Sequence, residues 1–208
     1  MTIIYESDSH KVVIEHDDDP MNPREWDNLG RMVCAHRRYN LGDENAEHLS
    51  RYSDWDDYFK NVILEDSSIE TVIALPLYLY DHSGITMSAS PFTSRWDSGQ
   101  VGWIYAYKDD FKDIPNAYVD GQFDPDKARD ILKAEVTVYD QYLRGDVYRY
   151  TLEKKETCTC CNHTRYTPVH SCGGIFADSE ADSIVYVKDD LSEEYKAILA
   201  PENITYKD

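Results

Sequence analysis

The stretch Leu75–Tyr107, LPLYLYDHSGITMSASPFTSRWDSGQVGWIYAY, holds the longest apolar runs of the chain and decides its fold. Leu and Tyr alternate up to Tyr80, and the turn residues of 81–84 then precede a predicted return strand over 85–90. A third strand is predicted over 100–107, which is rich in the β-branched and aromatic residues that pack on a pleated surface. The stretch therefore predicts a meander of antiparallel strands.

Elements on either side of this stretch predict an α+β fold. A hairpin is expected from strands 2–6 and 11–16, and a second pairing from strands 146–153 and 172–177. The clearest helix is predicted over 124–144, where apolar residues recur at spacings of three and four. Further helices are expected over 24–38, where Asn22 and Pro23 form a start signal, within 43–64, and over 190–199. We thus expect one domain over residues 1–208, with an antiparallel sheet packed against two or three helices.

The charge of the chain narrows the range of partners. Its 208 residues include 40 acidic and 21 basic ones, which gives a net charge of −19. Such a chain should repel nucleic acid and anionic membranes, because neutralising phosphates requires clustered Lys and Arg. No apolar run approaches the length of a membrane span, and the N-terminus lacks the pattern of a signal peptide. A cytoplasmic protein is therefore expected.

The cysteines indicate a metal site. Four of the five lie within 158–172, in the segment TCTCCNHTRYTPVHSC. The pairs Cys158/Cys161 and His170/Cys172 would place two soft ligands on each side of a loop, as in a closed tetrahedral zinc site. Such an ion would clip the hairpin between 147–153 and 172–177 in a structural role. Cys160 and His163 are spare candidates, and the alternative is a polar loop of unpaired thiols.

Acidic clusters recur along the chain and are the candidate partner-binding residues. Solvation explains any one cluster, but together they resemble the carboxylate coat of a protein that mimics DNA. The excess charge equals that of about nine or ten base pairs. The candidate residues are Asp17, Asp18, Asp19, Asp54, Asp56, Asp57, Glu65, Asp66, Asp109, Asp110 and Asp113.

A metal-dependent enzyme is a competing interpretation. Oxygen-rich clusters hold Mg²⁺ or Mn²⁺, and His16, Asp17 and Asp19 could converge with Asp81 and His82 on one ion. Adjacent side chains point in different directions, however, so three consecutive Asp cannot all face one ion without a special turn. Asp-rich turns are also ordinary loop chemistry.

Several segments together resemble an uncharacterised family of acidic proteins from bacteriophages and other mobile elements. They are spread over nearly the whole chain, and none is a recognised catalytic motif. The resemblance implies an accessory protein that acts inside a bacterium, and it implies no particular activity. The segments are HDDDPMNPREWDNLG (16–30), LYLYDHSGITMSASPF (77–92), WDSGQVGWIY (96–105), YDQYLRGDVY (139–148) and SCGG (171–174).

Charge and resemblance lead to one functional hypothesis and two rivals. The hypothesis is an inhibitor of a bacterial defence system, of the anti-CRISPR or anti-restriction kind, that occupies the basic groove of a host nuclease. Charge reversal at Asp54, Asp56 and Asp57 should weaken such a complex. The first rival is a metal-dependent hydrolase of a nucleotide or phosphoester. The second is a phage structural or regulatory module that binds another protein through its many Tyr, independently of charge.

Overall fold

The computed structural model describes residues 2–46, 49–65, 67–68, 70–94 and 96–207. The chain divides into two compact units, which we call the terminal unit (1–21 and 145–208) and the central unit (22–144). The single domain expected over residues 1–208 stays a prediction. Each unit is described by itself below.

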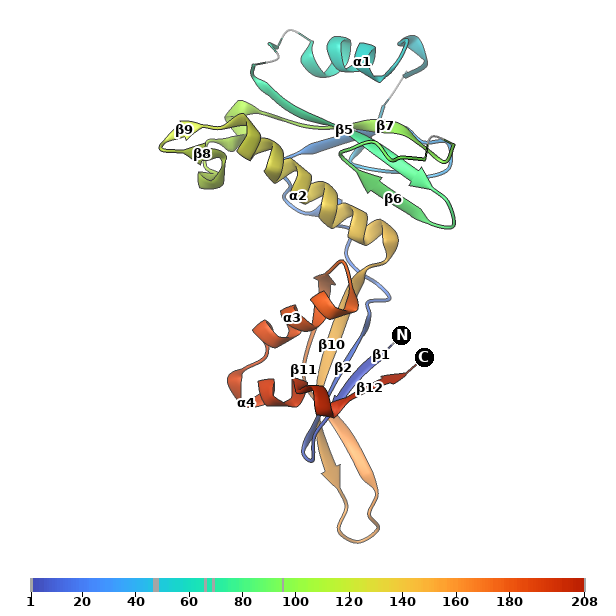
Figure 1. Ribbon diagram of the computed structural model, residues 1–208, viewed down its shortest axis with the longest axis vertical. Helices are drawn as coiled ribbons and strands as arrows, with labels where there is room; N and C mark the ends of the chain where they lie inside the picture. The colour runs from blue at the N-terminus through green and yellow to red at the C-terminus, as the bar shows by residue number, and fades with distance from the viewer. Residues whose placement is uncertain (1, 47–48, 66, 69, 95, 208) are drawn as a thin grey trace. The chain divides into compact units, whose positions relative to one another are not determined.

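A five-stranded, mostly antiparallel sheet with the strand order β4-β3-β7-β5-β6 forms the centre of the central unit (Figure 1). The three strands predicted from the Leu75–Tyr107 stretch are present as β5, β6 and β7. In one detail the order departs from a meander, because β7 pairs with β5 and β3 rather than with β6. The strands are β3 (Arg31–Cys34), β4 (Glu44–Asn45), β5 (Val72–Asp81), β6 (Ile85–Ser88) and β7 (Ser98–Tyr107), with a separate pair β8 (Tyr118–Val119) and β9 (Gln122–Phe123).

Helix α2 (Pro125–Arg144) packs on one face of this sheet and confirms the strongest helix prediction. Its start is set by Asp124, whose carboxylate accepts hydrogen bonds from the backbone N–H groups of Asp126 and Lys127. Its buried stripe includes Leu132 and Tyr139, which join the sheet residues in one apolar core. Fully buried side chains of this kind contribute about 1.5–3 kcal/mol each.

The opposite face of the same sheet is covered by a short helical segment, α1 (Trp55–Tyr58) continued by the π-helix η3 (Phe59–Leu64). Asp54 caps α1 by accepting from the backbone N–H of Asp57 at 2.9 Å, and this helical segment lies within 43–64, where a helix is predicted. Tyr58 is buried and Phe59 stacks on Trp103 of β7 with ring centroids 4.5 Å apart. The central sheet is therefore packed on both faces.

The helix expected over 24–38 is wrong. That segment forms a short 3₁₀ turn, η1 (Pro23–Glu25), followed by strand β3. The backbone N–H groups of Leu29 and Gly30 donate to the Glu135 carboxylate of α2 instead of to a helix ladder. Tertiary bonds thus replace the local pattern that favoured a helix.

Other short elements connect the strands and helices of the central unit. They are η2 (Leu49–Arg51), η4 (Lys108–Phe111) and η5 (Pro115–Ala117). Backbone hydrogen bonding ties η4 to the start of β5, because the N–H of Lys108 donates to the carbonyl of Thr71 at 2.8 Å.

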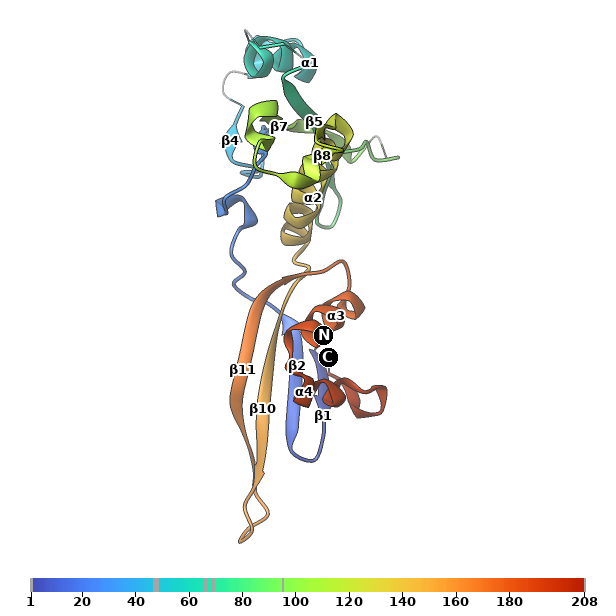
Figure 2. The same cartoon turned by 90° about the vertical axis from the view of Figure 1, so that its left-hand side faces the viewer.

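The terminal unit contains a second five-stranded antiparallel sheet, with the order β11-β10-β2-β1-β12. Both predicted pairings are present, but the second hairpin is longer than expected, and Figure 2 shows β10 and β11 running side by side along it. The elements are β1 (Thr2–Glu6), β2 (His10–His16), β10 (Val147–Thr157), β11 (Thr164–Phe176), α3 (Glu180–Asp190), α4 (Glu193–Lys196), η6 (Ala197–Leu199), η7 (Pro201–Asn203) and β12 (Ile204–Lys207).

The terminal sheet is covered on one face by the last helices. Val12 and Ile14 of β2, with Tyr150 of β10, join Val187 of α3 and Ile198 of η6 in one core. The predicted helix over 190–199 is present as α4 and η6, whereas the pattern did not indicate α3. Apolar and polar residues alternate on the strands, as expected for a sheet with one packed face.

The other face of the terminal sheet carries ion pairs between neighbouring strands. Lys11 pairs with Glu153 at 2.6 Å, and Arg149 pairs with Glu15 at 3.0 Å. These cross-strand pairs match positive with negative residues directly opposite each other. Among the described residues, no helix has the length and apolar character that a membrane span requires.

Candidate functional site

The turn at the end of the β10–β11 hairpin carries three of the five cysteines. The strands end in the pair Thr157 and Thr164, and the loop between them is closed by backbone hydrogen bonds. The N–H of Cys158 donates to the carbonyl of His163 at 2.8 Å, and the N–H of Asn162 donates back to Cys158 at 2.9 Å. Asn162 has a φ of 53°, in the left-handed region that Asn tolerates. Hydrogen bonds of the chain itself therefore hold this loop in shape.

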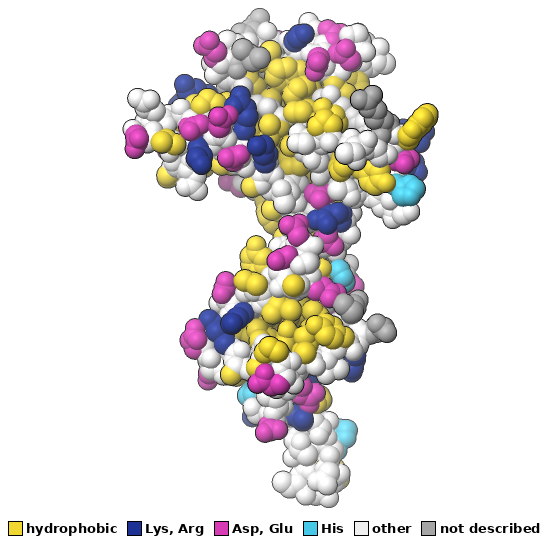
Figure 3. Space-filling model, in the orientation of Figure 1, with side chains coloured by type: hydrophobic (Ala, Val, Ile, Leu, Met, Phe, Trp, Pro, Cys, Tyr) yellow, Lys and Arg dark blue, Asp and Glu magenta, His cyan; other side chains and the backbone are white. Residues whose placement is uncertain are grey.

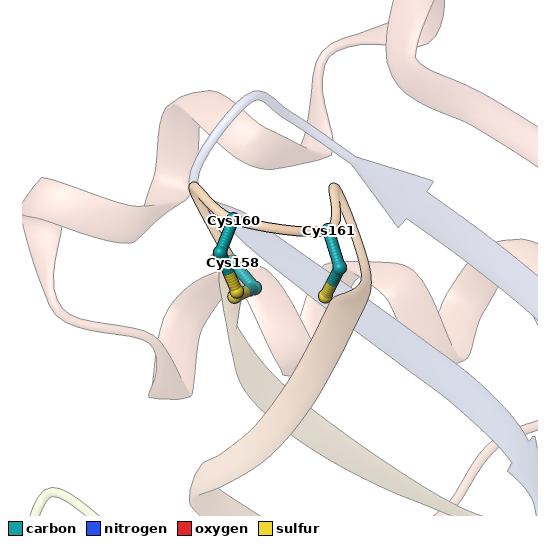
Figure 4. Close-up of side chains that lie close together, drawn as sticks. All are labelled: Cys158, Cys160 and Cys161. Carbon is teal, nitrogen blue, oxygen red and sulfur yellow. The ribbon is translucent and has the colours of Figure 1, made fainter.

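The loop brings the thiols of Cys158, Cys160 and Cys161 together (Figure 4). Their Sγ atoms all lie within 4.8 Å of one another, and those of Cys158 and Cys160 are 2.8 Å apart. Sulfur atoms bound to one tetrahedral zinc ion at about 2.3 Å are separated by about 3.7 Å, so small side-chain rotations would seat an ion. In the part of the chain that the structure describes, this is the one group of three or more such ligands. The three thiols, which we call the thiol cluster, could hold a metal ion.

Of the four predicted zinc ligands, the structure brings two together in the turn and places the other two elsewhere. Cys158 and Cys161 belong to the thiol cluster, with Cys160 as the third member. His170 and Cys172 lie along β11, opposite Leu152 and Tyr150. The hairpin continues past the expected strand ends to Thr157 and Thr164, and each residue adds about 3.3 Å. This extension places His170 about 20 Å along the strand from the turn.

The electrostatics of the thiol cluster favour a thiolate. Hydrogen bonding from the Cys160 thiol, and then from the backbone N–H groups of Cys160 and Cys161, lowers the pKa of Cys158 to about 7. The pKa of Cys160 is raised, chiefly because its thiol donates to Cys158. Burial raises the pKa of Cys34 to about 12, which keeps that thiol protonated. Thiolates are the metal-binding form of cysteine, so the Cys158 thiol is better suited to bind a metal than the Cys34 thiol of the core.

His170 takes part in a different contact. Its Nε2 lies 3.5 Å from the Asp190 carboxylate at the end of α3, and the Tyr150 hydroxyl donates to the same carboxylate at 2.5 Å. His170 and Asp190, with apolar neighbours such as Leu152 and Leu191, line a cavity of about 290 Å³. Burial and the Asp190 charge raise the pKa of Cys172 above its ordinary value. The group connects α3 to the sheet and is separate from the thiol cluster.

The aspartate run 17–19 is engaged with neighbouring groups of the terminal unit. Asp17 accepts hydrogen bonds from the backbone N–H groups of Gly174 at 2.9 Å and Asp19 at 3.3 Å. Asp18 pairs with Arg149 at 3.3 Å. Two of the three carboxylates therefore anchor the chain after β2, which is a structural role.

The residues of the proposed hydrolase site are divided between the two units. His16, Asp17 and Asp19 belong to the terminal unit, whereas Asp81 and His82 belong to the central unit. Asp81 forms an ion pair with Arg38, and His82 lies 3.7 Å from Asp97. No carboxylate cluster of metal-binding geometry is present among the described residues. Within either unit, the described members of this set therefore do not form a metal-binding cluster.

The remaining acidic candidates lie on the surface of the central unit. Asp54 and Asp56 are exposed at α1 with the half-buried Asp57, and Glu65 is exposed at the end of the π-helix. The candidates Asp109, Asp110 and Asp113 are exposed at and after η4, and Asp66 lies outside the described residues. On the face shown in Figure 3, acidic and basic side chains are interspersed. The face shown in Figure 3 therefore carries separate acidic clusters and not one unbroken acidic patch.

The carboxylates of Asp54, Asp56 and Asp57, which we call the α1 cluster, combine two features. Asp54 accepts from the N–H of Asp57, and Asp57 accepts from the N–H of Ser53 at 3.0 Å, so two carboxylates are held in place. No Lys or Arg forms an ion pair with the three within the described part of the chain. By contrast, Asp109 pairs with Lys112 at 3.1 Å.

Comparison of this chain with protein-family models, with curated proteins and with solved structures finds no match in any of the three.

Proposed function

We propose that this protein acts by binding rather than by turnover, as an acidic inhibitor of a bacterial defence system of the anti-CRISPR or anti-restriction kind. It would be encoded by a phage or mobile element and would act in the cytoplasm of the host bacterium. Its target would be a nuclease or complex with a basic nucleic-acid groove, and the protein would contact neither nucleic acid nor a membrane. The observation that carries the proposal is the α1 cluster, with its fixed and unneutralised carboxylates.

The physical argument rests on preorganisation. A charged side chain that is already held in place loses less conformational entropy on docking than a free one. The hydrogen bonds to Asp54 and Asp57 hold two negative charges at the start of α1, with Asp56 exposed beside them. Fixed charges of this kind can pair with the Lys and Arg that a nuclease uses for phosphates. The large negative charge of the whole chain would also steer it towards a basic groove.

Affinity capture at two salt concentrations tests this proposal. The protein is immobilised, bacterial lysate is applied at about 0.1 M salt, and bound proteins are eluted towards about 1 M, where the Debye length falls from about 10 Å to about 3 Å. We expect a nucleic-acid-binding defence enzyme to be released as the salt rises. Addition of duplex DNA should compete with its capture. A complex that resists both salt and DNA would contradict the proposal and would favour a charge-independent partner.

A matched pair of double variants distinguishes the α1 region from net charge. Asp56→Lys with Glu65→Lys reverses two exposed residues of the α1–η3 segment, and we expect it to lower the affinity strongly. The control, Asp126→Lys with Asp130→Lys, changes net charge equally on α2, where both residues pair with basic neighbours. Equal losses in the two double variants would show that only total charge matters, and would refute a role for the α1 region.

We also propose that the metal of the thiol cluster is zinc and that its role is structural. Thiolates are preferred zinc ligands, and zinc adds no redox chemistry to an exposed cysteine loop. Cys158, Cys160 and Cys161 would supply three ligands, and water or another side chain would complete the tetrahedron. An ion so held would fix the β10–β11 turn to the end of β10.

The zinc content of the purified protein and of two cysteine variants tests this assignment. After purification with zinc and removal of loosely bound ions, we expect about one zinc per chain by elemental analysis, and Cys160→Ser should lose it. Cys172→Ser, which removes a thiol outside the cluster, should retain the ion. Loss of zinc in Cys172→Ser and its retention in Cys160→Ser would overturn the three-thiol assignment.

A further inference from the structure

A polar cavity of about 380 Å³ lies within the central unit and is separate from the thiol cluster and the acidic candidates. It is formed where β3 ends, β5 ends and β7 begins, and these three strands are neighbours in the sheet. Backbone hydrogen bonds hold its walls: Ala35 N–H donates to Val101, and Asp81 N–H donates to Asp97, both at 2.8 Å. Its volume is in the range of small-molecule sites.

Gly102 allows the walls of this cavity to come together. A Cβ atom at this position would lie 2.1 Å from the carbonyl oxygen of Val33, so only glycine permits β3 and β7 to pair this closely. The end of β3 then continues directly into the segment His36–Arg38, which lines the cavity. The cavity is thus built by the sheet and not by a loop alone.

The charged groups that line the cavity differ in whether they form ion pairs. Asp81 forms an ion pair with Arg38 and accepts a hydrogen bond from the Tyr39 hydroxyl at 3.4 Å, so both groups are satisfied. Arg37 also lines the cavity and is exposed, and no carboxylate within the described residues forms an ion pair with it. Arg37 therefore presents an uncompensated positive charge to a ligand.

Trp96 gives the cavity an exposed aromatic wall. Its side chain is 98% exposed, the highest value among the exposed large hydrophobic residues of the described chain. A free indole face can stack on a planar ring, which contributes about 1–3 kcal/mol per base in nucleic-acid complexes. Asp97 lies beside it and offers carboxylate oxygens to the amino or hydroxyl groups of a ligand.

We propose that this cavity binds a nucleoside monophosphate, with the base stacked on Trp96 and the phosphate at Arg37. The negative charge of the chain favours a ligand with one phosphate over a polyanion, because the acidic surface would repel a polyanion more strongly. A mononucleotide presents only one phosphate, which the guanidinium of Arg37 can pair with. The planar base would stack on the Trp96 indole, which is otherwise exposed to solvent.

Isothermal titration with AMP, adenosine and inorganic phosphate, each used separately, tests the proposal on the full chain. We expect AMP to bind with a Kd in the micromolar to millimolar range, and more tightly than either fragment. Arg37→Glu should weaken AMP binding by about tenfold or more, since hydrogen bonds to charged groups are worth about 1.5–3 kcal/mol. Trp96→Leu should weaken it by about fivefold to a hundredfold.

Two control variants complete the test. Arg51→Glu changes an exposed arginine of the same unit that does not line the cavity, and Trp26→Leu changes another exposed tryptophan. Both should bind AMP as the unmodified chain does, and circular dichroism would confirm that all four variants are folded. The absence of a heat of binding with millimolar AMP would overturn the proposal. It would also be overturned if phosphate bound as tightly as AMP and Trp96→Leu had no effect on AMP binding. The double variant Asp56→Lys/Glu65→Lys should retain AMP binding, which separates this site from the proposed inhibitor surface.

Discussion

Replacement of Glu135 by alanine should destabilise the central unit more than any exposed charge change on the same helix. The Glu135 carboxylate accepts hydrogen bonds from the N–H groups of Leu29 at 2.9 Å and Gly30 at 3.1 Å, and pairs with Arg24 at 3.1 Å. Arg24 also pairs with Asp43 at 2.7 Å, and only 3% of its side chain is exposed. One carboxylate therefore joins α2 to the segment that leads into β3.

The size of the effect follows from these contacts. Loss of the carboxylate leaves two backbone N–H groups without their acceptor, and each costs about 1–3 kcal/mol where water cannot reach it. Removal of one partner of a buried ion pair costs about 3–5 kcal/mol, but Asp43 remains to pair with Arg24. Burial opposes the charged form of Arg24, yet bonding to Asp43 and Glu135 raises its pKa overall, so the guanidinium stays charged. We expect Glu135→Ala to lower the free energy of unfolding by about 3–4 kcal/mol.

Urea denaturation followed by circular dichroism measures this value. At an m-value of about 2 kcal/mol per M, the midpoint should fall by roughly 1.5–2 M. Glu135→Gln, which keeps the side-chain size and one acceptor oxygen, should lose about half as much. The control Asp130→Ala removes an exposed pair with Lys133 on the same helix and should change the stability by less than about 0.5 kcal/mol. If Glu135→Ala and Asp130→Ala had the same midpoint, the argument from burial would be refuted.

Two further predictions concern β7 and the terminal unit. Gly102→Ala should cost about 2 kcal/mol or more, because the added Cβ meets the Val33 carbonyl, whereas Gly99→Ala on the same strand meets nothing within 4 Å and should be nearly neutral in thermal melts. The hydrogen bond from Tyr150 is the main cause that lowers the pKa of Asp190, so its stabilisation is present above the ordinary carboxyl pKa of about 3.9 and is lost as the pH falls through the lower folded value. Urea denaturation from about pH 5 to about pH 3 should therefore show a steeper loss of stability in the unmodified chain than in Tyr150→Phe, and parallel curves would contradict this.

Helix α2 and the strands of Leu75–Tyr107 could be predicted because their signals are local. Asp124 and Pro125 mark a helix start, and apolar residues follow at helical spacing. The strands alternate and are separated by turn residues whose conformations are set within a few residues. Such signals act over distances that the sequence shows directly. They do not show which strand pairs with which, and so β7 lies beside β5 and β3 rather than beside β6.

The segment 24–38 shows how a distant contact overrides a local pattern. Trp26, Leu29 and Val33 recur at spacings typical of a helix, and the sequence favours one there. Its backbone donors instead reach Glu135, more than 100 residues away along the chain. Pairing with β7 then requires an extended backbone after Gly30. No local pattern contains this information.

The thiol cluster shows the same division between local and tertiary information. The sequence by itself determined that soft ligands gather near Cys158 and that the chain is strongly acidic, because residue type and spacing are read directly from it. Only the tertiary structure decided that Cys160 joins Cys158 and Cys161 while His170 and Cys172 lie along β11. The reason is strand register: a few more paired residues in a hairpin move a ligand by many ångströms, and register depends on packing against β2 and α3 rather than on the cysteine spacing.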